Sequence, residues 1–260
     1  MIRTLAHVSD LHMGRDDRTS EATRRIVAAL VEADVDAVLV TGDLTHRGRA
    51  AELREFEDAF EPLLATGRVV VVPGNHDRLG EDAGAGLMIG ARVGVADLAG
   101  VHVVRVDSTA PHNRSMIAAH GLLSEGDLAA VDGALGEAPR GALSVVMLHH
   151  HVLPLPPDDL AERLSSWLGW PNAAELSAGT DLLARASGRC DLVLHGHRHV
   201  PSIARPLAAG GRPLTVVNAG SSPGLGGARV FAHEDGVVRR MGWLPVAALD
   251  PARAPRERAA

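Results

Sequence analysis

The sequence of 260 residues has no lysine, no tyrosine and a single cysteine. Cys190 alone cannot form an internal disulfide, so a reducing compartment is expected. Without lysine, mechanisms that depend on a P-loop lysine or on a Schiff base are excluded. Aromatic residues make up only 2% of the chain, which argues against a base-stacking platform for single-stranded nucleic acid.

Long apolar runs are missing too. No stretch reaches the roughly 20 apolar residues needed to cross a bilayer, and the first ten residues lack the pattern of a secretory signal. These features predict a cytoplasmic protein without a membrane partner. The formal charge of −6 disfavours binding to nucleic acid mainly through its backbone phosphates, so no stable nucleic-acid partner is expected.

The remaining composition is typical of one globular domain. Hydrophobic residues form 46% of the chain, enough for one sizeable core at this length. We expect residues 1–246 to form a single domain and residues 247–260, rich in Ala, Arg and Pro, to form a loose tail. The proline-flanked stretch 154–183, which contains Trp167 and Trp170, is predicted to be a lid, a homodimer contact or packing over the core.

Hydrophobic periodicity predicts strands that alternate with helices. Apolar, β-branched runs are separated by segments whose apolar residues recur at helical spacing, the pattern of βαβ units around a parallel sheet. An antiparallel hairpin is expected near the end of the chain. The expected strands are residues 2–8, 35–40, 69–72, 101–106, 143–148, 192–194, 214–217, 229–232 and 237–242, and the expected helices include residues 20–33, 50–64 and one capped by Ser124.

Polar side chains follow five of these strands. In open α/β sheets, ligands collect beyond the carboxyl ends of the strands, so side chains at these positions are expected to meet. Residues i and i+2 of an extended segment project from the same face about 6.5 Å apart, which lets each pair aim two donors into one cavity. The polar side chains are Asp10 and His12, Asp43, the run Asn75, His76 and Asp77, the run His149 to His151, and His197 with His199.

The residue types indicate a metal site. Carboxylate and imidazole together suit borderline divalent ions such as Mn, Fe, Zn, Co or Ni, and the lack of a cysteine ligand disfavours a purely structural zinc site. Any single Asp or His at a strand end is more often a turn former, a helix cap or a surface residue. The coincidence of five such strand ends is the reason to expect metal binding.

These blocks resemble the ordered signature of the calcineurin-like metallophosphoesterase superfamily. They are Asp10-Leu-His12, Gly42-Asp43, Gly74-Asn-His-Asp77, the histidine run from His149, and Gly196-His-Arg-His199. The resemblance implies a four-layer αββα sandwich of two mixed β-sheets flanked by helices, with a site for two divalent or trivalent metal ions. It also implies one metal held by Asp10, His12, Asp43 and His199, and a second held by Asp43, Asn75, His149 and His197, with Asp43 bridging.

Two points stay open within the resemblance. His150 competes with His149 as the ligand from the histidine run, although His149 follows the predicted strand directly. The chain is most similar to the small cyclic-nucleotide and glycerophosphodiester phosphodiesterases, because of its compact size and the stretch from His120 to Glu125. Val152 stands where that group usually has a proline, which weakens the subfamily assignment.

The predicted function is hydrolysis of phosphodiesters, with phosphomonoesters as a second activity. Two cations would neutralise the ester oxygens and stabilise a bridging hydroxide as the nucleophile. We predict that Asp77 orients the His76 imidazole, and that His76 stabilises the transition state or protonates the leaving oxygen. The expected partner is a small phosphoester.

Two other functions remain open. A nuclease of the same superfamily is disfavoured by the acidic charge and the few aromatic residues. A non-catalytic scaffold that retains the fold would not need to keep every expected ligand. His46, His112, Asn113 and Arg114 are equally compatible with a pocket lining and with ordinary solvated loops.

Overall fold

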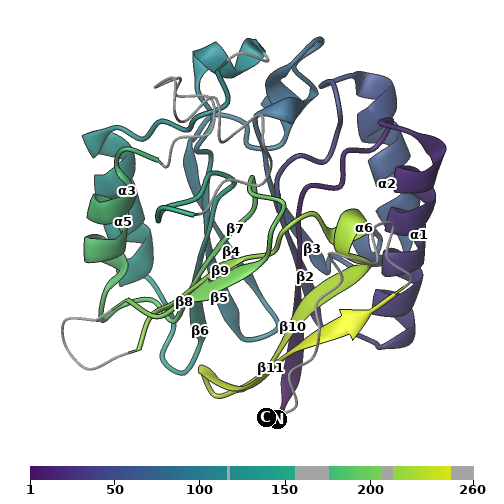
Figure 1. Ribbon diagram of the computed structural model, residues 1–260. Coiled ribbons are helices and arrows are strands. Elements are labelled where there is room, and N and C mark those ends of the chain that lie inside the picture. Colours follow the sequence, from purple (N-terminus) through teal and green to yellow (C-terminus); the bar gives the residue numbers. More distant parts are fainter. Residues whose placement is uncertain (116–117, 156–175, 207–212, 247–260) are drawn as a thin grey trace.

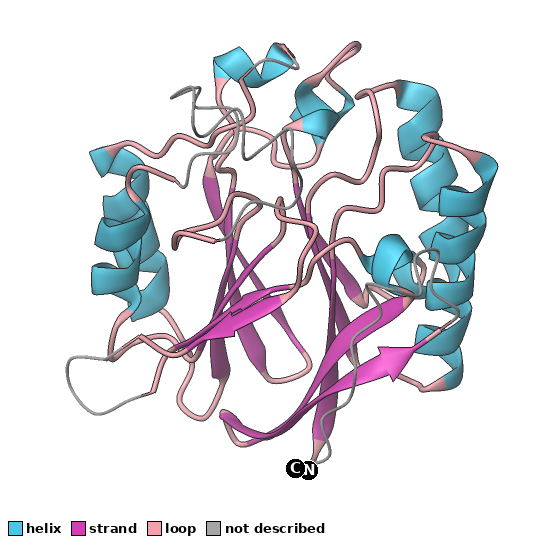
Figure 2. Cartoon of the chain, viewed as in Figure 1, coloured by secondary structure: helices cyan, strands magenta, loops and turns pink. Residues whose placement is uncertain are grey.

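The computed structural model describes residues 1–115, 118–155, 176–206 and 213–246. Within these ranges, two β-sheets pack face to face and helices cover both outer faces (Figure 1, Figure 2). The four-layer αββα sandwich expected from the sequence is confirmed. The expected tail and most of the stretch 154–183 lie outside the described residues.

The first sheet has five strands in the order β11-β10-β1-β2-β3. Its three strands nearest the N-terminus run parallel, and β10 joins β1 as an antiparallel neighbour. The predicted hairpin near the end of the chain is therefore part of this sheet. The strands are β1 (Arg3–Val8), β2 (Ala37–Thr41), β3 (Val69–Val72), β10 (Gly227–Glu234) and β11 (Val237–Pro245).

The second sheet has six strands in the order β4-β5-β6-β7-β9-β8. Its four central strands are parallel, whereas both edge strands are antiparallel to their neighbours. The sequence does not predict either edge strand, because β4 contains Gly94 and Asp97 and β8 has only three residues. The strands are β4 (Val93–Leu98), β5 (Val101–Val106), β6 (Leu143–Met147), β7 (Leu192–His195), β8 (Ser202–Ala204) and β9 (Thr215–Asn218).

Helices α1 and α2 cover the first sheet, and α3 and α5 cover the second (Figure 1). Helix α1 begins three residues before the predicted start, because the Asp16 carboxylate accepts the Thr19 N–H at 2.8 Å and caps it. Ser124 caps α3 as predicted. The helices are α1 (Asp17–Glu32), α2 (Ala50–Leu64), α3 (Glu125–Gly136), α5 (Gly179–Ala186) and α6 (Ser222–Leu225), with short 3₁₀ helices η1 (His76–Arg78), η2 (Ala83–Gly86) and η3 (Pro111–Arg114).

Apolar side chains fill three layers. Leu5 points between the two sheets while its neighbour Ala6 points toward α1 and α2, and Val103 and Val104 divide in the same way on the second sheet. The central strands are therefore buried on both faces, which explains why they appear in the sequence as continuous apolar runs.

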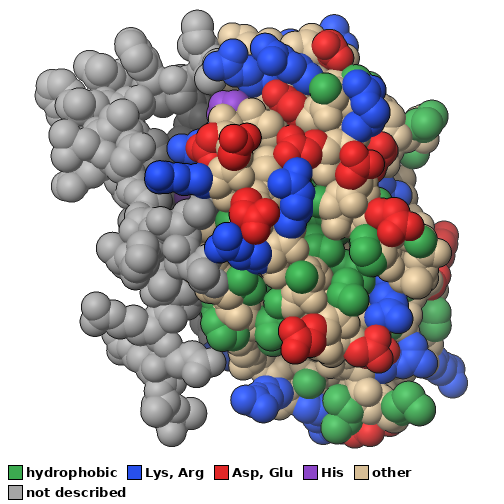
Figure 3. Space-filling model, turned by 90° about the vertical axis from the view of Figure 1, so that its right-hand side faces the viewer, with side chains coloured by type: hydrophobic (Ala, Val, Ile, Leu, Met, Phe, Trp, Pro, Cys, Tyr) green, Lys and Arg blue, Asp and Glu red, His purple; other side chains and the backbone are tan. Residues whose placement is uncertain are grey.

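The outer face of α1 and α2 carries interspersed acidic and basic side chains (Figure 3). Arg24 of α1 and Glu55 of α2 form an ion pair at 3.0 Å across the two helices. None of the described helices is long and apolar enough to span a bilayer.

His7 is fully buried in β1, where its Nε2 lies 2.9 Å from the Thr41 hydroxyl. Burial, reinforced by the nearby His195 and Arg229, lowers the pKa of His7 from 6.5 to about 3. The folded protein thus keeps His7 neutral while the unfolded chain takes up a proton below pH 6.5. Folding stability contributed by this residue is present above pH 6.5 and is lost as the pH falls toward 3, by about 1.4 kcal/mol per pH unit.

We therefore expect His7→Gln to reduce the acid sensitivity of folding. Between pH 6.5 and pH 5, the wild-type free energy of unfolding should fall by about 2 kcal/mol more than that of the variant. Urea unfolding at the two pH values measures this difference, since the other histidines titrate in both proteins. Equal losses in the two proteins would contradict the assignment.

Candidate metal centre

Loops at the carboxyl ends of five strands carry the candidate ligands. Asp10 follows β1, Asp43 follows β2 and Asn75 follows β3, whereas His149 follows β6 and His197 follows β7. The sequence predicted that these side chains share one sheet edge. The structure divides them between two sheets whose carboxyl ends meet at the upper side of Figure 1.

The backbone of this region is strained. Asp10, His12, Asp43 and His197 adopt positive φ angles of 54°, 47°, 50° and 69°, a conformation that residues with a side chain seldom take. Such strain persists only where the surrounding structure enforces it, and it concentrates at functional sites. Gly42 is required beside them, because a Cβ there would lie 2.6 Å from the His149 ring.

One set of donors gathers around His12. Its Nε2 lies 3.4 Å from Nε2 of His199 and 3.8 Å from Oδ2 of Asp43, and His199 Nε2 lies 3.5 Å from Oδ1 of Asp10. The donor atoms of Asp10, His12 and His199 all lie within 4.8 Å of one another. A single cation fits among these side chains.

A second set gathers around Asn75. Its side-chain oxygen lies 3.0 Å from His149 Nε2 and 3.1 Å from His197 Nδ1. His149 Nε2 lies 3.4 Å from Oδ1 of Asp43. Asp43 thus has one oxygen near each set, the arrangement that a bridging carboxylate requires.

The donor sets fit cations on a further observation. Within the described residues Asp10 Oδ1 is buried and accepts no hydrogen bond, with the His199 ring 3.5 Å away, and an unsatisfied buried carboxylate oxygen is costly without a positive partner. Carboxylate, imidazole and amide oxygen together suit borderline transition metals. The seven residues predicted as ligands are therefore brought together, although their binding of metal stays a prediction.

The surroundings of these side chains keep them in the protonation states that bind cations. It drives the pKa of His12 and of His197 well below the usual value, with neighbouring histidines adding to the effect, so both rings are neutral and able to bind metal. Burial alone would raise the pKa of Asp10, but the contact with His199 and the charge of His149 lower it below its usual value. Asp10 is therefore a carboxylate, as a ligand must be.

The two neighbouring histidines that the sequence left ambiguous have different surroundings. The His149 Nδ1–H donates to the Thr41 carbonyl at 2.8 Å, so that Nε2 faces Asp43 and Asn75. Both ring nitrogens of His150 are engaged elsewhere, Nδ1 with the Ser108 hydroxyl at 2.8 Å and Nε2 with the Ala119 carbonyl at 2.9 Å. The geometry favours His149 as the ligand.

We expect His149→Ala to lose at least one of two bound metal ions and His150→Ala to keep both. His150 instead connects the end of β6 to the loop at Ser108 and Ala119, so its loss should disturb that loop. Metal content of the purified variants, measured by inductively coupled plasma mass spectrometry, distinguishes the two. Loss of metal from His150→Ala with retention in His149→Ala would reverse the assignment.

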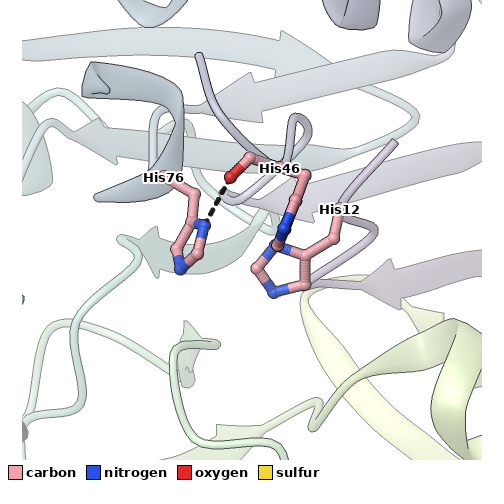
Figure 4. A group of neighbouring side chains, drawn as sticks. All are labelled: His12, His46 and His76. Atoms are coloured by element: carbon pink, nitrogen blue, oxygen red, sulfur yellow. Dashed lines mark hydrogen bonds between the residues drawn. The ribbon is translucent and has the colours of Figure 1, made fainter. Parts of the chain in front are cut away.

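His76 lies beside the first donor set. Figure 4 shows its ring with those of His12 and His46, three imidazoles from the loops after β1 and β2 and from the start of η1. The His76 and His12 ring centroids are 4.6 Å apart. The His76 Nδ1–H donates a hydrogen bond to the His46 carbonyl at 2.7 Å, so Nε2 is the nitrogen left to hold or transfer a proton.

The prediction that Asp77 orients the His76 ring is wrong. The Asp77 carboxylate accepts hydrogen bonds from the backbone of Leu44, Thr45 and Gly74, while the His46 carbonyl orients His76. Burial, together with the charge of Asp43, raises the pKa of Asp77 to about 6. Asp77 therefore fixes the loops that carry Asp43 and Asn75, and acts on the site through them.

Of the four residues predicted either to line the pocket or to lie in solvated loops, only one lies beside the candidate ligands. The His46 ring lies beside those of His12 and His76. Arg114 instead pairs with Asp82 at 2.7 Å, and the His112 Nε2–H donates to the His120 carbonyl at 2.8 Å. The Asn113 side-chain amide donates to the Ala118 carbonyl within its own loop. Within the described ranges, the hydrogen bonds, ion pairs and ring contacts of these last three residues do not involve the seven candidate ligands.

The hydrogen bonds that support the Asp10 loop are not predicted from the sequence. The Ser222 hydroxyl accepts the Ser9 N–H at 3.0 Å, and the Ser221 hydroxyl donates to the Asp10 carbonyl at 3.2 Å. These bonds hold the first ligand loop across more than 200 residues of sequence. No local pattern predicts them, since serine is common in loops of every kind.

Comparison with known proteins gives a family and several relatives. Residues 3–201 match the family described as calcineurin-like phosphoesterase. A probable cyclic nucleotide phosphodiesterase of Rhodococcus erythropolis is 28% identical over 219 residues, which cover 77% of this chain and 66% of that protein. A protein of the same description from Vesicomyosocius okutanii is 22% identical over 152 residues, covering 57% of this chain and 60% of that protein. The chain thus spans less than two thirds of the length of either relative.

Solved structures share the fold. A purple acid phosphatase from yellow lupin seeds superposes with a TM-score of 0.63 at 13% identity, covering 93% of this chain and 53% of that one. A dimetal phosphatase from Danio rerio superposes with a TM-score of 0.60 at 12% identity, covering 94% and 99%. At these identities the likeness concerns the fold alone.

Proposed function

Because this chain belongs to the calcineurin-like phosphoesterase family, we propose that it hydrolyses small phosphodiesters at the histidine-rich site. The observation that supports this most directly is the position of Asp43, whose two oxygens face the two donor sets at 3.8 Å and 3.4 Å. The two curated relatives are described as probable cyclic nucleotide phosphodiesterases, which favours diesters over monoesters.

Seven side chains would hold two cations. Mn, Fe and Zn suit the donors best, with Co and Ni as further candidates. Cations bound there would neutralise the anionic oxygens of the ester and would lower the pKa of a bound water. One set is Asp10, His12, Asp43 and His199, and the other is Asp43, Asn75, His149 and His197.

The protein's own groups supply the rest. His76 Nδ1–H is fixed by the His46 carbonyl, which aims Nε2 toward the same space as His12. In the charged form, Nε2–H can donate its proton to the leaving oxygen as the P–O bond breaks. The Asp43 carboxylate also accepts the His76 backbone N–H at 2.8 Å, which couples the position of His76 to the centre.

A substrate panel tests the proposal. The purified protein, loaded in turn with Mn²⁺, Zn²⁺, Co²⁺, Ni²⁺ and, under anaerobic conditions, Fe²⁺, should release p-nitrophenol from bis-p-nitrophenyl phosphate faster than from p-nitrophenyl phosphate. Cyclic nucleotides and glycerophosphodiesters extend the panel to natural diesters. Cleavage of plasmid DNA at a higher rate than any small diester would favour the nuclease, and absence of turnover with every metal would favour the scaffold.

A further inference from the structure

A cavity of about 760 Å³ lies at the amino ends of the central strands, opposite the candidate metal centre. Its wall is formed by the amino ends of three adjacent parallel strands, at Ser144 of β6, Leu192 of β7 and Thr215 of β9. The turn between β10 and β11 closes another side, where Gly236 packs so tightly that a Cβ would lie 2.8 Å from the Ala142 carbonyl. We call this space the basal cavity.

The basal cavity is lined by an excess of positive charge. Four arginines but only two aspartates line it, in a chain whose formal charge is −6. Three of the four arginines form no ion pair with any residue in the described ranges, and the fourth lies 3.9 Å from Glu234. The Asp191 carboxylate is engaged by the Ser144 N–H at 2.8 Å. The charged residues are Arg140, Arg205, Arg239, Arg240, Asp191 and Asp235.

The remaining lining includes apolar side chains. Leu192, Val238 and Met241 supply the apolar part. The volume lies within the range of pockets that bind small organic ligands.

We propose that the basal cavity binds a phosphorylated organic molecule of nucleotide size. Guanidinium groups that form no ion pair within the described part of the chain match a phosphate dianion, because each can donate two parallel hydrogen bonds to its oxygens. The apolar side chains then cover the organic part. Ser144 lies five residues before His149 along β6, about 16 Å in an extended strand, so this ligand does not touch the metal centre.

Isothermal titration of the whole protein with AMP tests the proposal. Asp43→Asn, which is expected to weaken the metal centre, should still bind one AMP. Adding Arg205→Gln and Arg240→Gln to Asp43→Asn should weaken that binding at least about tenfold, since two charge-assisted hydrogen-bond donors are lost. Inorganic phosphate should compete with AMP and adenosine should not, and the affinity should fall as salt is added.

Control variants separate this site from the catalytic one. Arg24→Gln with Arg25→Gln removes the same charge from α1, where both arginines pair with glutamates, and should leave AMP binding unchanged. Arg205→Gln with Arg240→Gln alone should leave turnover unchanged. Absence of AMP binding to Asp43→Asn, or equal binding after the two cavity arginines are replaced, would overturn the proposal. Neither result depends on whether the protein hydrolyses phosphodiesters.

Discussion

Replacing Asp43 by Asn is expected to reduce the metal content from two ions to one or none and to lower kcat at least about 1,000-fold. The substitution preserves shape but removes the negative charge that faces both donor sets, through Oδ2 toward His12 and Oδ1 toward His149. Because the side chain is nearly isosteric, the fold should be retained. Mass spectrometry of bound metal and turnover of bis-p-nitrophenyl phosphate measure the two effects.

Asp58→Asn provides the matched control for this prediction. Asp58 is exposed on α2, far from the strand ends, and its replacement should change neither metal content nor turnover. Two tightly bound ions and wild-type turnover in Asp43→Asn would show that Asp43 does not bridge the sets.

Replacing His76 by Ala is expected to lower kcat by about 10²- to 10⁴-fold while both metal ions stay bound. His76 is not among the predicted ligands, and its Nε2 is the nitrogen available for proton transfer. The loss should depend on the leaving group. A p-nitrophenyl diester, whose leaving group departs without a proton, should lose less than an alkyl diester whose alkoxide must be protonated.

His46→Ala is the control for His76. This variant removes an imidazole next to His76 but keeps the backbone carbonyl that accepts from His76 Nδ1. It should therefore retain much more activity than His76→Ala. Loss of metal from His76→Ala, or equal losses with both kinds of leaving group, would refute proton transfer by this residue.

Most of the fold could be predicted because its central strands are buried on both faces and have few polar residues. Strands such as β2 and β6 stand out as continuous apolar runs, since helices cover one face and the other sheet covers the second. The edge strands β4 and β8 could not be found in this way. Their residues are half exposed, and only pairing with β5 and β9 holds them extended.

The sequence by itself determined which residue types follow which strands, because a carboxylate or imidazole after a buried apolar run can be recognised locally. Their order also indicated the family. Only the tertiary structure shows that His149 Nε2 faces Asp43 and Asn75 while both ring nitrogens of His150 bond elsewhere. It likewise shows that the His46 carbonyl, and not Asp77, is the partner of His76. The reason is physical: neighbouring histidines on one loop point in different directions, and a backbone carbonyl carries no signature in the sequence.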